Sequence, residues 1–206
     1  MTDANPGGEY YSTPKTEWLS DSDGMKLLEA FRYKDPAGRM WTAPSGSVIN
    51  GASIPRIAWA IVGSPYQMPY RDASIIHDHY CDSMERTWEE THRVFYDAML
   101  TSRTSESEAL IKYWAVVRGG PRWDDHYRWS GLWPFKVPRA GRDHDAAFAP
   151  SSVAKSAVLT TPSPMLEETL LAELNSITMQ AEAGTLSPSE IRAIVEQQID
   201  RQPDPG

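Results

Sequence analysis

Four residues with metal-binding or acid–base side chains lie in one short part of the chain. His77, Asp78 and Cys81 fall within five consecutive positions, and His92 follows His77 by fifteen positions. Imidazole, carboxylate and thiolate groups gathered in this way can transfer protons or hold a metal ion. We therefore take this cluster as the candidate site, with His77, Asp78 and His92 as the candidate catalytic residues.

Two chemistries fit these residue types. In the first, His77 takes a proton from water, while Asp78 and loop oxygens hold Ca²⁺ so that the metal polarises an ester or amide carbonyl. In the second, His77, His92 and either Cys81 or Asp78 bind Zn²⁺ and leave a fourth position for water. The residue types alone leave both alternatives open.

The expected local structure decides which side chains share a face. The spacing predicts that His77 and Cys81, four residues apart, share one face of a helix, with Asp78 about 100° around it. His92 is expected on the next helix. If the two helices pack antiparallel across a short loop, His92 comes to face His77.

The hydrophobic pattern predicts an α+β protein, with a small N-terminal antiparallel β-meander packed on a cluster of three to four helices. Two strands, 25–33 and 39–43, flank a Pro- and Gly-containing turn at 35–38, and a short strand follows at 47–50. Helices are predicted at 53–62, 71–84, 88–100 and 105–117. Ser105 and Glu108 fit a capping box at the start of the last of these.

Composition divides the chain into segments. Residues 1–16 are polar and are expected to form a flexible arm before a core domain over 17–145. Within this core, residues 121–142 interleave aromatic and basic side chains and are predicted to wrap the body as irregular chain. Residues 146–163 have linker composition, and 164–206 are expected to form an acidic helical hairpin.

Charge and cysteine content limit the classes of function. The net charge is −8, of which −6 falls after residue 163, so the body is nearly neutral and its composition argues against a nucleic-acid partner. Cys81 is the single cysteine, which excludes an intramolecular disulfide. The first residues do not resemble a signal peptide and no run of eighteen apolar residues occurs, so we expect synthesis in the cytoplasm and no transmembrane segment.

Several motifs occur in an order that resembles a known family. They are Gly51–Trp59, Tyr70–Asp78, Arg86, Phe95–Met99, and Ala115–Gly120 followed by Trp123. This order resembles the domain of unknown function family 1353, over residues of about 25 to 123. That family occurs in bacteriophages, prophages and bacteria, and its members have no settled activity.

This chain departs from the pattern of that family at two positions. Asn50 and His92 stand where the family usually has Asp, so the chain lacks two carboxylates that could belong to the family's site. His92 keeps a polar, metal-competent side chain at the second of these positions.

The helical His–Asp pair also has a distant likeness to the pattern of bacterial and fungal phospholipase A2. That likeness implies that His77 is the base and Asp78 the calcium ligand, with His92 where an orienting Asp is expected. A neutral imidazole does not stabilise an imidazolium as a carboxylate does. The pattern also has paired cysteines, which this chain lacks.

Two functions follow as hypotheses. The first is a phage- or prophage-type hydrolase that uses the His77 and Asp78 site, with Ca or Zn, to attack an ester or amide of the cell envelope of the host. The alternative is a virion-associated or assembly protein without enzymatic activity, which binds another phage protein through its C-terminal helices.

Overall fold

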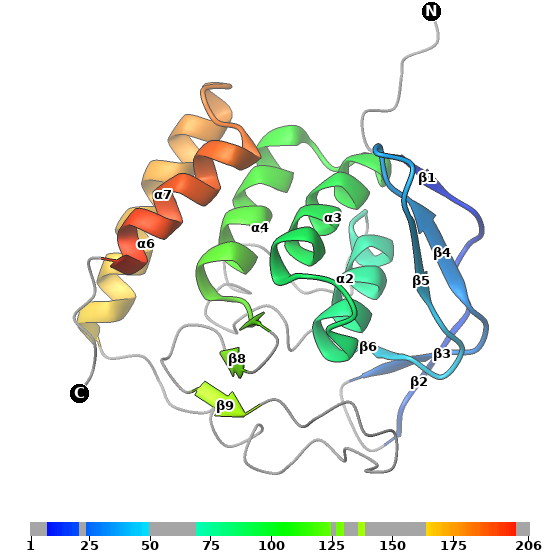
Figure 1. Ribbon diagram of the computed structural model, residues 1–206. Helices are drawn as coiled ribbons and strands as arrows, with labels where there is room; N and C mark the ends of the chain where they lie inside the picture. The colour runs from blue at the N-terminus through cyan, green and yellow to red at the C-terminus, as the bar shows by residue number, and fades with distance from the viewer. Residues whose placement is uncertain are drawn as a thin grey trace, which may run out of the picture.

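The computed structural model describes residues 8–20, 24–49, 69–124, 127–129, 136–138 and 164–200. Figure 1 shows three groups of elements side by side: two small sheets, then a group of three helices, then a pair of C-terminal helices. The α+β class predicted from the sequence is confirmed. The candidate site lies in the central group of helices.

Six short strands form the two N-terminal sheets. They are β1 (Glu9–Tyr10), β2 (Thr16–Trp18), β3 (Met25–Leu27), β4 (Phe31–Lys34), β5 (Met40–Ala43) and β6 (Val48–Ile49). One sheet has the strand order β1-β4-β5 and the other β2-β3-β6, and every pairing is antiparallel. The chain alternates between these sheets instead of forming one continuous meander.

The segment predicted as one strand over 25–33 is divided between the two sheets. Its first part is β3 and its second part is β4, separated by a bend at 28–30. The side chains of Leu27 and Phe31 are both buried, whereas the three residues between them are exposed. Along one flat strand, every second side chain between Leu27 and Phe31 would point inward, so the exposure of all three intervening residues breaks the alternation that such a strand requires. The predicted hairpin is present as β4 and β5, and its strands pair Phe31 with Ala43.

The part of residues 1–16 that the structure describes is attached to the body and does not form a free arm. Strand β1 pairs with β4, and the Tyr10 hydroxyl donates a hydrogen bond of 3.0 Å to the carbonyl of Ala98. The Tyr10 ring also stacks on Phe31, with a centroid separation of 5.4 Å. The composition of this segment is polar, so its few aromatic contacts were not evident from periodicity.

Three helices follow: α2 (Arg71–Ser83), α3 (Trp88–Thr101) and α4 (Glu106–Gly119). They agree with the predicted spans to within two residues at each end. The side chain of Ser105 accepts a hydrogen bond from the Glu108 backbone amide, as the predicted capping box requires. Thr87 caps α3 in the same way. These caps satisfy backbone N–H groups that the first helical turn leaves unpaired.

The two predicted C-terminal helices are present as α6 (Pro164–Glu182) and α7 (Pro188–Asp200). Ser187 and Glu190 form a capping box at the start of α7, with the Ser187 amide 2.7 Å from Glu190 Oε2. Both helices pack on α4. Leu174, Ile177, Ile191 and Val195 belong to the same buried cluster as the core helices. These four side chains of α6 and α7 are therefore covered within this chain.

The segment 121–142, predicted to be irregular, contains three short strands. They are β7 (Arg122–Trp123), β8 (Tyr127–Trp129) and β9 (Lys136–Pro138), which pair antiparallel in that order. Alternating aromatic and basic residues suit a strand as well as an irregular wrap, and cross-strand pairing decides between them. The predicted helix at 53–62 and the predicted linker at 146–163 lie outside the described residues.

The structure describes the helices α2, α3, α4, α6 and α7. None of them combines the length and the apolar character needed to cross a bilayer.

Candidate metal centre

The candidate site lies between α2 and α3, which are joined by only four residues. Met84 ends α2 in the left-handed conformation, with φ of 51°, and Thr87 begins α3. A connection this short places the helices side by side and antiparallel. His77 lies six residues before the end of α2 and His92 four residues after the start of α3, so the two reach similar heights on facing helices.

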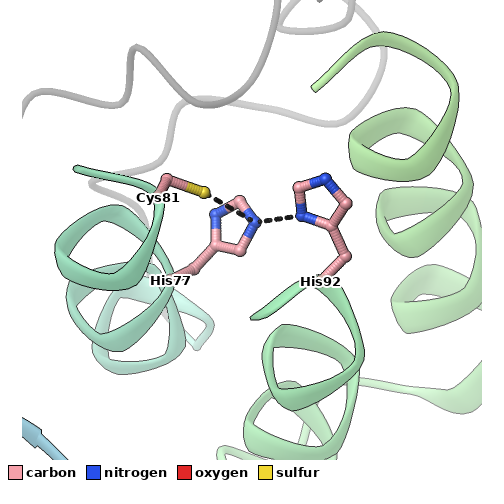
Figure 2. A group of neighbouring side chains, drawn as sticks. All are labelled: His77, Cys81 and His92. Atoms are coloured by element: carbon pink, nitrogen blue, oxygen red, sulfur yellow. Dashed lines mark hydrogen bonds between the residues drawn. The ribbon is translucent and has the colours of Figure 1, made fainter. Parts of the chain in front are cut away.

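Three side chains converge there. Figure 2 shows the rings of His77 and His92 approaching each other, with Cys81 beside His77 on the same helix. The Nε2 atom of His77 lies 2.9 Å from Nδ1 of His92, and the Cys81 Sγ atom lies 3.6 Å from the same Nε2 atom. One ligand atom from each residue falls within 4.8 Å of the other two. Two of these residues come from one helix and the third from its neighbour.

The three side chains are withdrawn from water. His92 and Cys81 have no exposed surface and His77 is 1% exposed. Burial lowers the pKa of His77 to about 3. Burial also lowers the pKa of His92 well below its ordinary value, and the charges of His77 and Arg122 act in the same direction. Both imidazoles are therefore neutral at physiological pH, which is the form that binds metals.

Aromatic rings enclose the two histidines. Phe95 stacks on His77 with a centroid separation of 4.6 Å. Trp88 and Trp123 present edge contacts to His92, at 5.7 and 6.4 Å. An apolar wall of this kind favours neutral ligands and strengthens their interaction with a bound cation.

The segment after α4 closes the site over His92. The Nε2 atom of His92 lies 3.1 Å from the carbonyl oxygen of Pro121. Gly120 permits this approach, because a Cβ atom there would lie 2.3 Å from the Val116 carbonyl oxygen and 3.2 Å from Cε1 of His92. The orientation of His92 thus depends on a backbone group 29 positions further along the chain.

The distances can be compared with those of a tetrahedral zinc site. Zinc bond lengths of about 2.0–2.1 Å to nitrogen and 2.3 Å to sulfur place neighbouring ligands about 3.3 Å apart for two nitrogens and about 3.6 Å for nitrogen and sulfur. The Cys81–His77 separation of 3.6 Å equals the second value. The His77–His92 separation of 2.9 Å is shorter, because those two nitrogens share a hydrogen bond. A shift of a few tenths of an ångström between the two rings would bring the His77–His92 nitrogen distance from 2.9 Å to the value of about 3.3 Å expected for two zinc ligands.

Asp78 and the other histidines lie outside this group of converging ligand atoms. Asp78 is buried, and its Oδ1 atom is 3.9 Å from Nδ1 of His77, on the side of the ring away from His92. His79 points elsewhere, since its Nδ1 atom lies 3.3 Å from the Ser47 hydroxyl. His126 and His144 are outside the described residues, as are residues 50–53.

Sequence reasoning missed the groups that surround the site. Phe95 and Trp88 are apolar residues of a helix, which are common in any helical core, and a backbone carbonyl such as that of Pro121 cannot be recognised from a side-chain type. The Trp123 indole donates a hydrogen bond of 2.8 Å to the carbonyl of Arg86, which closes the end of the helical pair. One feature of the sequence could have indicated that the chain turns back over the site. It is the Gly120–Pro121 pair directly after a helix, which marks a sharp change in chain direction.

Residues 25–116 match the family described as "Protein of unknown function (DUF1353)". This segment contains strands β3 to β6, helices α2 and α3 and most of α4, and therefore all three converging side chains. The family resemblance inferred from the motif order is confirmed as a match over these residues, which make up a little less than half of the chain.

Two curated proteins of Sinorhizobium fredii (strain NBRC 101917 / NGR234) are similar to the chain. "Uncharacterized protein y4jT" is 39% identical over 119 residues, which cover 56% of this chain and 35% of that protein. "Uncharacterized protein y4iH" is 48% identical over 99 residues, which cover 48% of this chain and 41% of that protein. The matched region thus spans about a third to two fifths of these relatives. No solved structure matches the chain.

Proposed function

We propose that this protein binds a transition metal, with zinc the best match, through His77, Cys81 and His92. A zinc ion held by these three residues would supply an activated water for the hydrolysis of an ester or amide bond. The observation that carries the proposal is the convergence of the three ligand atoms within 4.8 Å of one another. We take this bond to belong to a component of the host cell envelope, because the family resemblance implies an association with phages and prophages.

The donor set supports zinc over calcium. Zinc prefers imidazole nitrogen and thiolate sulfur, whereas calcium takes six to eight oxygen ligands. The converging atoms here are two nitrogens and one sulfur. The Asp78 carboxylate is not among them, because its Oδ1 atom is 3.9 Å from Nδ1 of His77, the ring nitrogen that does not contact His92.

The electrostatics of His77 also favour the metal alternative over direct base catalysis. A pKa of about 3 makes the ring a poor proton acceptor at neutral pH. The same low pKa keeps the ring neutral and free of competing protons, which favours metal binding. His77 is therefore better suited to hold a metal that activates water than to activate water itself.

Three protein ligands leave one position open for water, which is the arrangement of catalytic rather than structural zinc sites. The chemistry that zinc would supply there is activation of water at neutral pH, because it would lower the pKa of a coordinated water to about 7. The ligands are buried, so hydrolysis requires a path from solvent to the fourth position. Metal binding and hydrolysis are consequently tested separately.

The first experiment measures metal binding. Purified protein, stripped with a chelator and then titrated with Co²⁺ as a spectroscopic substitute for zinc, should bind one equivalent. A thiolate-to-metal charge-transfer band and tetrahedral d–d bands are expected. Cys81→Ser should lose the charge-transfer band, and His92→Ala should bind much more weakly. His79→Ala is the matched control, because His79 lies on the same helix but outside the cluster.

A wild-type protein that binds neither Co²⁺ nor Zn²⁺ would overturn the proposed site. The second experiment compares ester hydrolysis by the zinc-loaded and metal-free protein, first with a small activated ester and then with phospholipid and peptidoglycan. Activity that requires zinc and is lost in Cys81→Ser supports the hydrolase. Stoichiometric zinc without any hydrolysis would limit the function to metal binding.

A further inference from the structure

The hydrogen bond to Pro121 determines which nitrogen of His92 carries the proton. A carbonyl oxygen only accepts, so Nε2 of His92 must be the donor in the 3.1 Å contact with Pro121. The ring has no exposed surface, and in its neutral form it has a single N–H group. Its Nδ1 atom is left with a free lone pair. This is the tautomer that can bind a metal through Nδ1.

The same reasoning gives the opposite result for His77. Its Nε2 atom lies 2.9 Å from the free lone pair of His92 Nδ1, so Nε2 of His77 must carry the proton and donate it. A metal bound by Nδ1 of His92 and Sγ of Cys81 would require a lone pair at that same Nε2 atom. His92 is thus ready to bind, whereas His77 is in the wrong tautomer.

To become a ligand, His77 must lose the proton at Nε2 and carry one at Nδ1, so that the ring stays neutral. The Nδ1 atom lies 3.9 Å from Oδ1 of Asp78, and both side chains are buried. A buried N–H group requires an acceptor, and a carboxylate is a strong one. The present separation exceeds a hydrogen bond, and a small rotation of either side chain would close it.

We infer that Asp78 is a positioning residue that accepts the Nδ1–H of His77 when a metal binds, and so selects the tautomer in which Nε2 is a ligand. This inference rests on the proposed metal site. It changes the role expected for Asp78 from ligand to hydrogen-bond acceptor. It also makes the two histidines complementary: each would bind metal through one nitrogen, while the other nitrogen donates to a fixed oxygen, Pro121 O for His92 and Asp78 Oδ1 for His77.

The direct test is the tautomeric state of the two rings in the wild-type protein. Long-range ¹H–¹⁵N NMR spectra should show His77 protonated at Nε2 in the metal-free protein and at Nδ1 in the zinc-loaded protein. The Nδ1 proton should be shifted downfield by its carboxylate acceptor. His92 should keep its proton on Nε2 in both states. A His77 ring that already carries its proton on Nδ1 without metal, or whose bound Nδ1 proton shows no such acceptor, overturns the inference.

Variants of Asp78 provide a second test, by zinc competition titration. Asp78→Ala removes the acceptor, and Asp78→Asn can donate its amide N–H to Nδ1 and so hold the wrong tautomer. Both should bind zinc about 10- to 100-fold more weakly, as expected for loss of a group that orients a ligand. Asp82→Asn, an exposed position one turn further along α2, is the matched control and should bind as the wild type does.

The two proposals fail in different ways. If the wild-type protein binds no metal, both the proposed metal site and the proposed role of Asp78 are wrong. If the wild type binds zinc and both Asp78 variants bind it equally well, only the role of Asp78 is wrong. Circular dichroism of each variant shows whether it is folded. The NMR test does not depend on any variant.

Discussion

His77 and His92, fifteen positions apart, meet through a 2.9 Å contact between Nε2 and Nδ1 at a place where neither ring is exposed to water. Each ring has an additional neighbour on its other side, Phe95 for His77 and the Pro121 carbonyl for His92. Buried polar atoms that are paired in this way stabilise one arrangement of the two helices.

The first prediction concerns the coupling between these two rings. His92→Ala leaves the buried Nε2–H of His77 without its acceptor, so it should lower the free energy of unfolding by about 2–4 kcal/mol. The double variant with His77→Ala should cost less than the sum of the single variants, by about 0.5–3 kcal/mol. Urea denaturation in the presence of chelator gives these values. Strict additivity would show that the contact contributes nothing.

The second prediction concerns metal removal. The site's polar atoms are hydrogen-bonded without metal, so the chelated protein should stay folded, unlike a structural zinc finger. Zinc at about 100 times its dissociation constant should add about 2.7 kcal/mol and raise the melting temperature by roughly 5–10 °C. Differential scanning calorimetry measures both. Cys81→Ser should show a smaller rise, and unfolding on chelation would contradict the prediction.

The third prediction concerns Gly120. A methyl group there would meet the Val116 carbonyl oxygen at 2.3 Å, which is far inside van der Waals contact. Gly120→Ala should therefore lower the free energy of unfolding by about 1–3 kcal/mol. Because the same segment holds His92 through Pro121, zinc affinity should fall as well. If Gly120→Ala keeps both the stability and the zinc affinity of the wild type, the backbone around residue 120 can adjust to the added methyl group and the prediction is wrong.

The fourth prediction concerns acid stability. Burial acts to raise the pKa of Asp35, but hydrogen bonds from Trp41 and from the backbone and side chain of Arg39 hold it below its ordinary value. Since the unfolded chain then binds a proton more readily, Asp35 stabilises the protein above about pH 4 and loses this contribution as the pH falls through its folded value.

Asp35→Asn should therefore be less stable than the wild type at pH 7, and the difference should shrink below about pH 4. Chemical denaturation at a series of pH values provides the measurement. A stability difference that does not change with pH would mean that the ionisation of Asp35 is not linked to folding.

The fifth prediction concerns the C-terminal helices. Arg118 on α4 is paired with Glu173 on α6 at 2.9 Å, and the Arg118 side chain is only 5% exposed. Glu173→Gln leaves a buried guanidinium without its counter-charge and should cost about 3 kcal/mol. Glu182→Gln, exposed on the same helix, should have little effect. Equal stability of the two variants would show that α6 is not energetically coupled to the body.

Much of the local structure could be predicted from short stretches of sequence. The capping pairs Ser105–Glu108 and Ser187–Glu190 mark helix starts through interactions over three residues, so no distant contact is needed to recognise them. The same locality explains why His77 and Cys81 were placed together. The division of 25–33 between two sheets was not predicted. Which strands pair depends on contacts with segments that are distant in the sequence, and these contacts leave no local pattern.

The sequence by itself determined the ligand types, their placement on two successive helices, and the short loop that turns one helix back on the other. Tertiary structure alone decided that the rings touch, that both are neutral, and that the Pro121 carbonyl fixes the tautomer of His92. The physical reason is that desolvation and hydrogen-bond direction depend on every group packed around a side chain. Here those groups come from α2, α3 and the segment after α4, which are brought together only by the fold.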